Sequence, residues 1–254
     1  MNAPARSLSE RADELEEQQM KDFENRIIAK SLLYNLADGD RSTGGSEAPG
    51  PGRPFLMGED PRLPRMPDKP TLFDFYKYRF AQKPGIQHVL QSANLAQKNG
   101  LPEKMVLACL LHDIAVTGFI RSDHGYWGAQ LIEPYVDEEV SWAIRMHQAL
   151  RFYPDESVGY AYPEQYIRMF GPDYRPEPYI EAEYQRAKNH KWYMSARMIC
   201  VNDLYSFDPD VVVTPEQFED IVGRHFRTPK EGLGNDNTSA SHMWRTLRRP
   251  CNAL

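Results

Sequence analysis

Apolar residues recur at helical spacing over most of this chain, from about Thr71 to Phe226, and this periodicity most limits its fold. One example is the segment 86–95, with apolar residues at positions 86, 89, 90, 93 and 95. Such spacing places them on one face of an α-helix. Alternation with period two, which a half-buried strand needs, is weak, and Val211–Val213 is the one candidate strand. The pattern predicts an all-α core.

Proline, glycine and capping residues mark the helix boundaries in this core. Pro84 stands where a first-turn proline would, Asn99-Gly100 is expected to stop that helix, and Pro102 to start the next. Asp137 is expected to cap a further helix. Another helix is predicted over about residues 191–205.

Two segments of different composition flank the core. The first begins with a helix predicted from about Ser7 to Leu36, where Ser7 and Glu10 have the form of a capping box. Seven prolines between positions 49 and 70 predict an irregular arm after it. We therefore expect a helix and Pro/Gly-rich arm over 1–70, the core over 71–226, and a basic, loosely ordered tail over 227–254.

Composition limits the location and partners of the protein. Of the 254 residues, 41% are hydrophobic and 26% are charged, as in soluble globular proteins. The longest apolar run, Met105–Leu111, is far shorter than the roughly 20 residues of a membrane-spanning helix. Three scattered cysteines and a start without a signal-peptide apolar region predict a reducing, cytoplasmic location. The net charge of −6 predicts neither nucleic acid nor membrane as a partner.

Four of the seven histidines fall between positions 88 and 147. They lie on, or at the end of, apolar segments predicted to be helical, as does an aspartate further along the chain. Titratable groups on apolar helix faces need partners, and a metal ion is one such partner. The candidate ligands, in chain order, are His88, His112, Asp113, His124, His147 and Asp203.

These residue types favour one kind of metal site. Imidazole and carboxylate suit Fe, Mn, Zn or Ni, and the absence of a cysteine cluster excludes a structural zinc site of the thiolate kind. Six candidate ligands exceed what one catalytic metal needs, because such a metal keeps an open position. They suit two metals that share a bridging carboxylate. In the doublet, Asp113 can bridge while His112 binds one metal.

A single histidine or a single His-Asp doublet is more often an ordinary polar residue, so the prediction depends on the ordered set. The remaining histidines, His190, His225 and His242, lie in polar contexts and are interpreted as surface residues. Asp123, next to His124, is interpreted as a helix cap rather than a ligand.

At these residues the chain resembles the HD-domain superfamily, named for the doublet seen here as His112-Asp113. It is also similar to the mixed-valent diiron oxygenase branch, which includes myo-inositol oxygenase and the HD-domain oxygenases that cleave organophosphonates. Ile86–Ile114 resembles the phosphonate enzymes from their first histidine to the doublet. HQALRFYP (His147–Pro154) and NDLYSF (Asn202–Phe207) resemble two motifs of inositol oxygenase. The resemblance covers roughly residues 75–215.

The resemblance implies an HD-domain helical bundle holding two Fe ions, Fe(II)/Fe(III), with O2 as co-substrate. One iron would be held by His88, His112, Asp113 and Asp203, and the other by His124 and His147, with Asp113 bridging. The implied reaction hydroxylates or cleaves a small polar organic substrate at a carbon next to a metal-chelating hydroxyl or amine. It implies no catalytic residues beyond the metal ligands.

The chain departs from these enzymes at their cationic positions. Val116 replaces a basic or imidazole side chain after the doublet, and Phe207 replaces a lysine of inositol oxygenase. Arg151 stands in place of the phosphonate enzymes' lysine, and we predict that it binds an anionic substrate group. A solvated arginine at a helix end is the alternative. Tyr78 matches a tyrosine that covers the vacant iron, although its aromatic surroundings favour a packing role.

Three function classes follow. The first is an O2-dependent diiron oxygenase acting on a small-molecule substrate. The second is a dimetal HD phosphohydrolase acting on a nucleotide or phosphate ester, since some HD hydrolases use the same six ligands. No Gly-rich phosphate loop supports it, whereas Arg121, Arg145 and Arg151 do. The third, a non-catalytic HD scaffold, is disfavoured because all six ligand positions are filled. Substrate and oligomeric state stay open.

Overall fold

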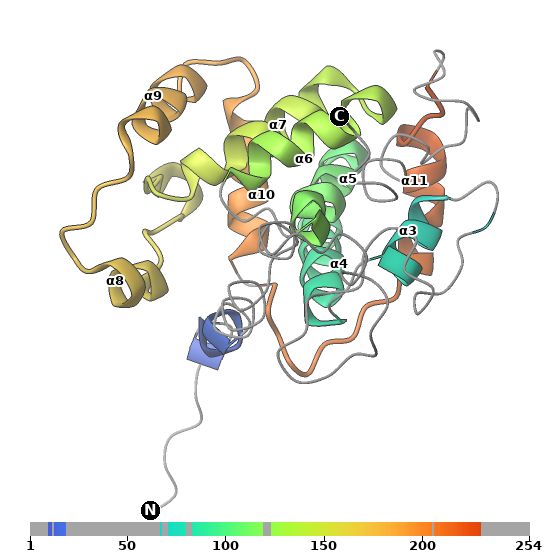
Figure 1. Ribbon diagram of the computed structural model, residues 1–254, viewed down its shortest axis with the longest axis horizontal. Coiled ribbons are helices and arrows are strands. Elements are labelled where there is room, and N and C mark those ends of the chain that lie inside the picture. The colour runs from blue at the N-terminus through green and yellow to red at the C-terminus, as the bar shows by residue number, and fades with distance from the viewer. Residues whose placement is uncertain are drawn as a thin grey trace, which may run out of the picture.

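We describe the fold from a computed structural model of the chain (Figure 1). The structure describes residues 10–11, 13–18, 67, 71–79, 83–118, 123–204 and 206–229. Within these ranges the chain forms helices and no named strand, which confirms the all-α prediction. The longer helices are α3 (Leu72–Arg79), α4 (Lys83–Lys98), α5 (Glu103–Leu111), α6 (His124–Ile132), α7 (Glu138–Leu150), α8 (Glu164–Phe170), α9 (Pro178–Ala187), α10 (Tyr193–Asp203) and α11 (Glu219–His225).

Four helices form the centre of the bundle. The central helices α4, α5, α7 and α10 pack against one another, α6 and α9 pack on α7, and α11 packs on α5 (Figure 1). The residues Met105–Leu111 of α5 are all buried, so the longest apolar run of the sequence is the middle of the core. No helix within the described ranges is long and apolar enough to span a membrane.

The helix boundaries follow the local sequence. Helix α4 ends at Lys98, and Gly100 adopts a positive φ of 70°. The amide of Leu101 donates to the carbonyl of Ala96, and that of Gly100 to Gln97, which is the Schellman arrangement that closes a helix. The predicted stop at Asn99-Gly100 and the restart after Pro102 are therefore confirmed.

Asp137 precedes α7 as predicted, but its side chain makes no capping hydrogen bond. Its carboxylate instead lies 3.6 Å from Arg227. Asp123 likewise stands before α6 without a side-chain cap, and it accepts a hydrogen bond from the Tyr179 hydroxyl at 2.7 Å. In both places the position is that of a cap, and the side chain contacts a distant residue.

The candidate strand Val211–Val213 has no strand conformation. Its backbone is paired instead with glutamine side chains of α4. Gln87 both donates to the Val213 carbonyl (2.9 Å) and accepts from the Val213 amide (3.0 Å), and Gln91 donates to the Val211 carbonyl (2.7 Å). These amide groups satisfy the main chain without a neighbouring strand.

The flanking segments lie largely outside the described residues. Of the helix predicted from Ser7 to Leu36, residues 10–11 and 13–18 are described, and they are helical. The predicted arm, apart from Pro67, and the tail beyond residue 229 lie outside the described residues.

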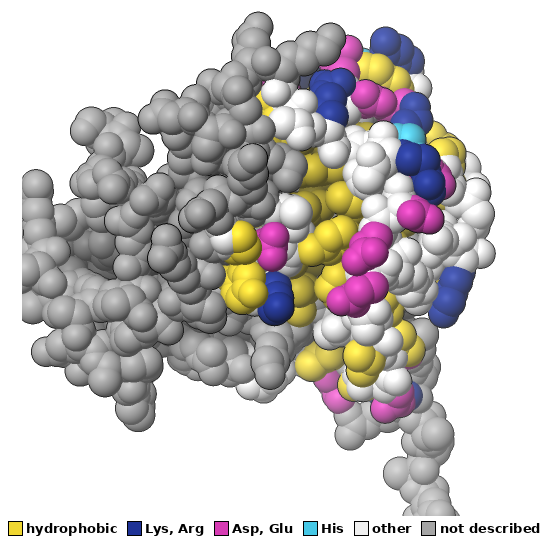
Figure 2. Space-filling view, turned by 90° about the vertical axis from the view of Figure 1, so that its right-hand side faces the viewer, with side chains coloured by type: hydrophobic (Ala, Val, Ile, Leu, Met, Phe, Trp, Pro, Cys, Tyr) yellow, Lys and Arg dark blue, Asp and Glu magenta, His cyan; other side chains and the backbone are white. Residues whose placement is uncertain are grey.

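Figure 2 shows the side of the molecule that carries α3 and α11 in Figure 1. Hydrophobic side chains gather in a band on this face, and acidic and basic side chains lie interspersed around it. The described part of this face therefore carries charges of both signs.

Candidate metal centre

The six predicted ligands come from the four central helices and from α6. Each of these helices brings a polar group to the place where its neighbours cross: His88 on α4, His112 and Asp113 directly after α5, His124 at the start of α6, His147 on α7 and Asp203 at the end of α10. Residues up to 115 positions apart thus meet at one buried place.

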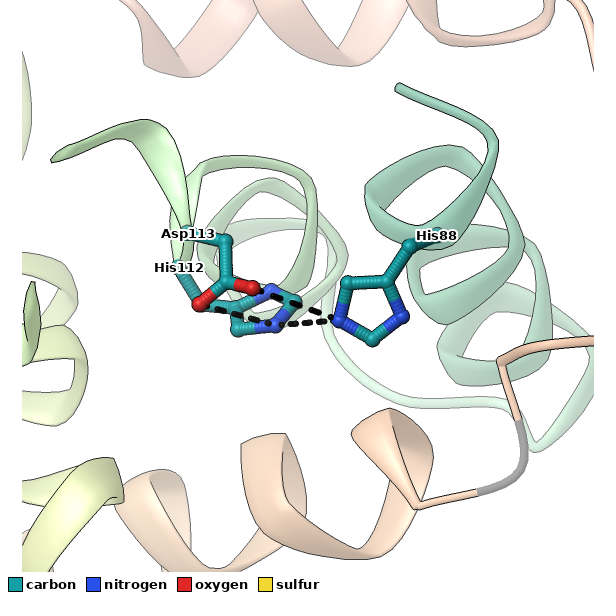
Figure 3. Close-up of side chains that lie close together, drawn as sticks. All are labelled: His88, His112 and Asp113. Carbon is teal, nitrogen blue, oxygen red and sulfur yellow. Dashed lines mark hydrogen bonds and ion pairs between the residues drawn. The ribbon is translucent and has the colours of Figure 1, made fainter. Parts of the chain in front are cut away.

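The first cluster joins α4 to the end of α5 (Figure 3). The Nε2 atoms of His88 and His112 lie 3.1 Å apart, and Asp113 lies 3.5 Å from His88 and 3.6 Å from His112. The carboxylate of Asp203 lies 3.0 Å from His88 and 3.6 Å from His112. His88, His112 and Asp113 together form a group that could hold one metal ion.

The second cluster shares a residue with the first. The Nε2 atoms of His124 and His147 lie 3.1 Å apart. Asp113 Oδ1 lies 3.4 Å from His124 and 4.0 Å from His147. These three residues form a second group that could hold a metal ion, and Asp113 belongs to both groups. This is the arrangement that a bridging carboxylate requires.

Hydrogen bonds fix the orientation of two imidazole rings. His112 Nδ1 lies 2.7 Å from the Cys109 carbonyl, and His147 Nδ1 lies 2.6 Å from the Ile144 carbonyl. A carbonyl oxygen only accepts, so each Nδ1 carries the proton and each Nε2 presents a lone pair. Backbone carbonyls orient metal-binding histidines in this way.

Ser206 orients the third ring, that of His88. The Ser206 hydroxyl donates to the Asp203 carbonyl at 2.5 Å, so its oxygen accepts from His88 Nδ1 at 2.7 Å. His88 therefore also presents an Nε2 lone pair, facing that of His112. Ser206 was not among the sequence candidates, although it belongs to the NDLYSF segment that drew attention to Asp203.

The arrangement fits a bound cation. Two imidazole lone pairs that face each other at 3.1 Å repel unless a positive charge lies between them. Within the described part of the chain, no hydrogen bond reaches the buried atoms Asp113 Oδ1, Asp203 Oδ1 and Asp203 Oδ2. Buried carboxylate oxygens are costly without partners, and metal ions are partners for both carboxylates and imidazoles.

The pKa shifts show how strongly the cluster attracts positive charge. Burial lowers the pKa of His88, but Asp113 and Asp203 outweigh it and raise the pKa to about 10, so without a metal ion a proton takes the Nε2 lone pair. Burial opposes ionisation of Asp203, yet Arg151 and the histidines hold its pKa well below the usual range. The pKa of His147 is well below its usual value because of burial and the neighbouring His124 and His112. The centre therefore favours ionised carboxylates together with a compensating cation.

Arg151 lies beside the cluster, at the C-terminal end of α7. Its Nε is 3.4 Å from Asp203 Oδ2, its Nη2 donates to Glu16 at 3.1 Å, and its side chain is 11% exposed. The alternative of a solvated arginine is therefore wrong. Glu16 was not among the sequence candidates, because it belongs to a polar run far from the motifs.

Phe207, Tyr78 and Val116 are the other positions at which the sequence was compared with the oxygenases. Phe207, where inositol oxygenase has a lysine, stacks on the His88 ring with centroids 4.1 Å apart. A flat apolar group thus covers one face of a candidate ligand. Tyr78 lies on α3, half-buried against the hydrophobic core. Its role in substrate binding stays a prediction, as does that of Arg151. Val116 is half-buried in a short 3₁₀ helix after the doublet.

The histidines interpreted as bystanders lie apart from the cluster. His190 stacks on Trp142 with centroids 4.0 Å apart, and His225 lies 3.0 Å from Glu103. His242 lies outside the described residues.

Comparison with known proteins gives two matches. The HD domain family matches residues 85–183, which include five of the six candidate ligands. A curated relative is 30% identical over 80 residues, covering 26% of this chain: a (1-hydroxy-2-(trimethylamino)ethyl)phosphonate dioxygenase (glycine-betaine-forming) from Leisingera caerulea. The matched part spans 39% of that relative's length.

The two matches and the structure agree. The matched range begins in α4 and ends in α9, and it contains the doublet His112-Asp113 at the crossing of the central helices. These findings support the HD superfamily, and the matched range folds as part of an all-α helical bundle.

Proposed function

We propose that this chain is a non-haem diiron oxygenase of the HD type, which uses O2 to oxidise a small polar organic substrate. The carrying observation is that Asp113 belongs to both three-residue groups, so one carboxylate can bridge two metal ions. The HD domain and the relative support an HD-type oxygenase or hydrolase. The relative's name, a phosphonate dioxygenase, favours the oxygenase.

The six side chains would divide between two irons. His88, His112 and Asp203 would hold the first, His124 and His147 the second, and Asp113 both. When bound, the Fe(II)/Fe(III) pair would supply a Lewis acid for a substrate hydroxyl or amine and an open position for O2. The carbonyls that bind Nδ1 of His112 and His147 keep each ring in the tautomer that presents Nε2.

The exposure of the side chains indicates the side from which substrate approaches. Asp113 and His124 are 19% and 11% exposed, whereas the side chains of His112, His147 and Asp203 are at most 1% exposed. Substrate would therefore approach the pair from the side of Asp113 and His124. Phe207 and the surrounding core exclude water from the His88 side.

The second candidate is a dimetal phosphohydrolase, because the same six residues also suit that reaction. The observation that favours it is the Arg151 guanidinium, 3.4 Å from Asp203, since arginine binds phosphate through a planar fork. Arg145, the other described arginine of that set, lines a separate surface pocket with Glu183, 3.6 Å away. Arg121 lies outside the described residues.

The two candidates differ in what they need from O2. We expect anaerobic reconstitution with Fe(II), followed by partial oxidation, to give the EPR signal of a coupled Fe(II)/Fe(III) pair. His225→Ala should give the same signal, because His225 lies on the surface beside Glu103. A chain that shows no such signal but hydrolyses phosphate esters without O2 would be the phosphohydrolase.

A further inference from the structure

The N-terminal helical segment, described at residues 10–11 and 13–18 and blue in Figure 1, is joined to the core by ion pairs along its length. Arg11 lies 3.0 Å from Asp208 and 2.6 Å from Asp210, in the loop after α10. Toward the other end of the segment, Glu16 lies 3.1 Å from Arg151. Charges more than 130 positions apart in the chain thus dock this segment beside the candidate metal centre.

The docked face of the segment is acidic. Asp13 and Glu16 stand three residues apart, which places them on one side of a helix. They are only 7% and 8% exposed, whereas Glu14 is exposed. Asp13 lies 3.4 Å from Arg168 of α8. Buried carboxylates are rare unless they are paired, and each of these two lies beside an arginine, Asp13 beside the exposed Arg168 and Glu16 beside the mostly buried Arg151.

Arg151 lies between Glu16 and the metal centre. Its Nη2 donates to Glu16 Oε1, its Nε lies 3.4 Å from Asp203 Oδ2, and its guanidinium carbon lies 5.2 Å from the centre of the Tyr166 ring. One guanidinium group therefore separates Glu16 from a candidate ligand. Carboxylate, phosphate and phosphonate groups bind arginine through the same charge-assisted hydrogen bonds. Glu16 holds a position that such a substrate group would take.

The surroundings of Glu16 disfavour the ionised form of its carboxylate. Burial raises the pKa of Glu16, Arg151 offsets this only in part, and the negative charge of Asp203 adds to it. Burying this carboxylate thus costs free energy that its one arginine does not fully return. Glu16 and an anionic ligand would use the same guanidinium group of Arg151, so the two exclude each other there.

We propose that Glu16 is a specificity-determining residue: its carboxylate occupies the anion position on Arg151, and a substrate reaches that position only by displacing it. The inference deepens the proposed function, because it places the anionic part of the substrate at Arg151. Substrates without an anionic group at that place react with the segment docked. Substrates with one must compete with Glu16.

Inorganic phosphate is the probe, and its affinity for the metal-loaded full chain is measured by calorimetry. Glu16→Gln removes the competing charge, so phosphate should bind at least about tenfold more tightly than in the unmodified chain. Glu14→Gln, the same change on the exposed side of the segment, should leave the affinity unchanged. In an Arg151→Gln background the gain from Glu16→Gln should disappear, because the anion position itself is lost.

Hydrogen exchange of the unmodified chain gives a second measurement that does not depend on how the variants fold. Saturating phosphate should raise the amide exchange of residues 10–18, since the bound anion replaces the Glu16 contact. Equal affinities for Glu16→Gln and Glu14→Gln, the same gain without Arg151, or unchanged exchange at saturation would each overturn the proposal. Both measurements use the metal-loaded chain, but neither needs turnover or a coupled Fe(II)/Fe(III) pair. A missing EPR signal would therefore refute the diiron oxygenase and leave the role of Glu16 standing.

Discussion

Two histidine–carboxylate pairs in this protein have the same separation and opposite surroundings. His88 Nε2 lies 3.0 Å from Asp203, and His225 Nε2 lies 3.0 Å from Glu103. The first pair is 5% and 1% exposed, and the second is 31% and 44% exposed. Distance alone does not distinguish them. Their burial and their other partners do.

In the surface pair, both carboxylate oxygens of Glu103 have partners. Arg224 donates to both oxygens of Glu103, at 2.9 and 2.7 Å, and His225 lies close to the same carboxylate. At Asp203, by contrast, neither oxygen receives a hydrogen bond within the described part of the chain. The buried pair, even with Arg151 3.4 Å from Asp203, can therefore accept a further cation, whereas Arg224 and His225 already satisfy Glu103. The following changes test this difference, beginning with the largest expected effect.

Asp113→Ala should remove nearly both metal ions, because its carboxylate belongs to both groups. Glu103→Ala, the matched change at the surface pair, should leave the metal content unchanged. Metal per chain is measured by elemental analysis after dialysis of the reconstituted protein. If the Asp113 variant kept its full metal content, the ligand assignment would be wrong.

His124→Ala should lower the bound metal toward half. This change removes a ligand from the second group only, and His88, His112 and Asp113 remain for the first. His225→Ala is the control and should retain the metal of the unmodified chain. The same elemental analysis measures the metal content of both variants. Equal metal content would show that His124 is not a ligand.

Two glycines test packing in the same two regions. A Cβ on Gly125, next to His124, would lie 2.8 Å from the Ile144 carbonyl oxygen and 3.0 Å from that of Arg145. Because both contacts are with backbone of α7, Gly125→Ala should destabilise the fold by about 1–3 kcal/mol. Gly223 in α11 has open space around it, so Gly223→Ala should stabilise by about 0.5–1 kcal/mol.

Urea denaturation gives the free energy of unfolding for both variants. A Gly125→Ala variant as stable as the unmodified chain would show that α6 and α7 do not approach each other as closely as described.

The smallest effect is expected at the surface pair and depends on pH. Arg224 and His225 lower the pKa of Glu103 from 4.5 to about 2. The stability from this ionised carboxylate is therefore fully present above pH 4.5 and is lost as the pH falls toward 2. Thermal unfolding of Glu103→Gln should show a small deficit at pH 6 that shrinks toward pH 2, because the pair is solvent-exposed. A deficit that grows as the pH falls would contradict this assignment.

The sequence predicted the helical bundle because a helix depends on residues only a few positions apart. Apolar residues at helical spacing, together with Asn99-Gly100 and Pro102, placed α4 and α5 close to their observed bounds. The same local contexts distinguished His88 on an apolar face from His225 in a polar one. The structure then brought all six candidates together, although their role as ligands stays a prediction.

Other contacts in the site join residues far apart in the sequence, and no local pattern predicts them. Ser206 acts on His88 across 118 positions, and Glu16 reaches Arg151 across 135. Nothing near Glu16 distinguishes it from its acidic neighbours in the sequence. Phe207 was visible as the loss of a lysine, but its stacking on His88 was not.

The sequence by itself determined that the chain folds into helices and which polar residues lie on their apolar faces. Both depend on contacts between residues a few positions apart, because backbone hydrogen bonds and helix faces repeat within one or two turns. Only the tertiary structure decided that Asp113 is shared between two clusters and that Arg151 lies between Asp203 and Glu16. Those contacts arise where separate helices cross, and the angle and depth of each crossing are set by the packing of the whole core.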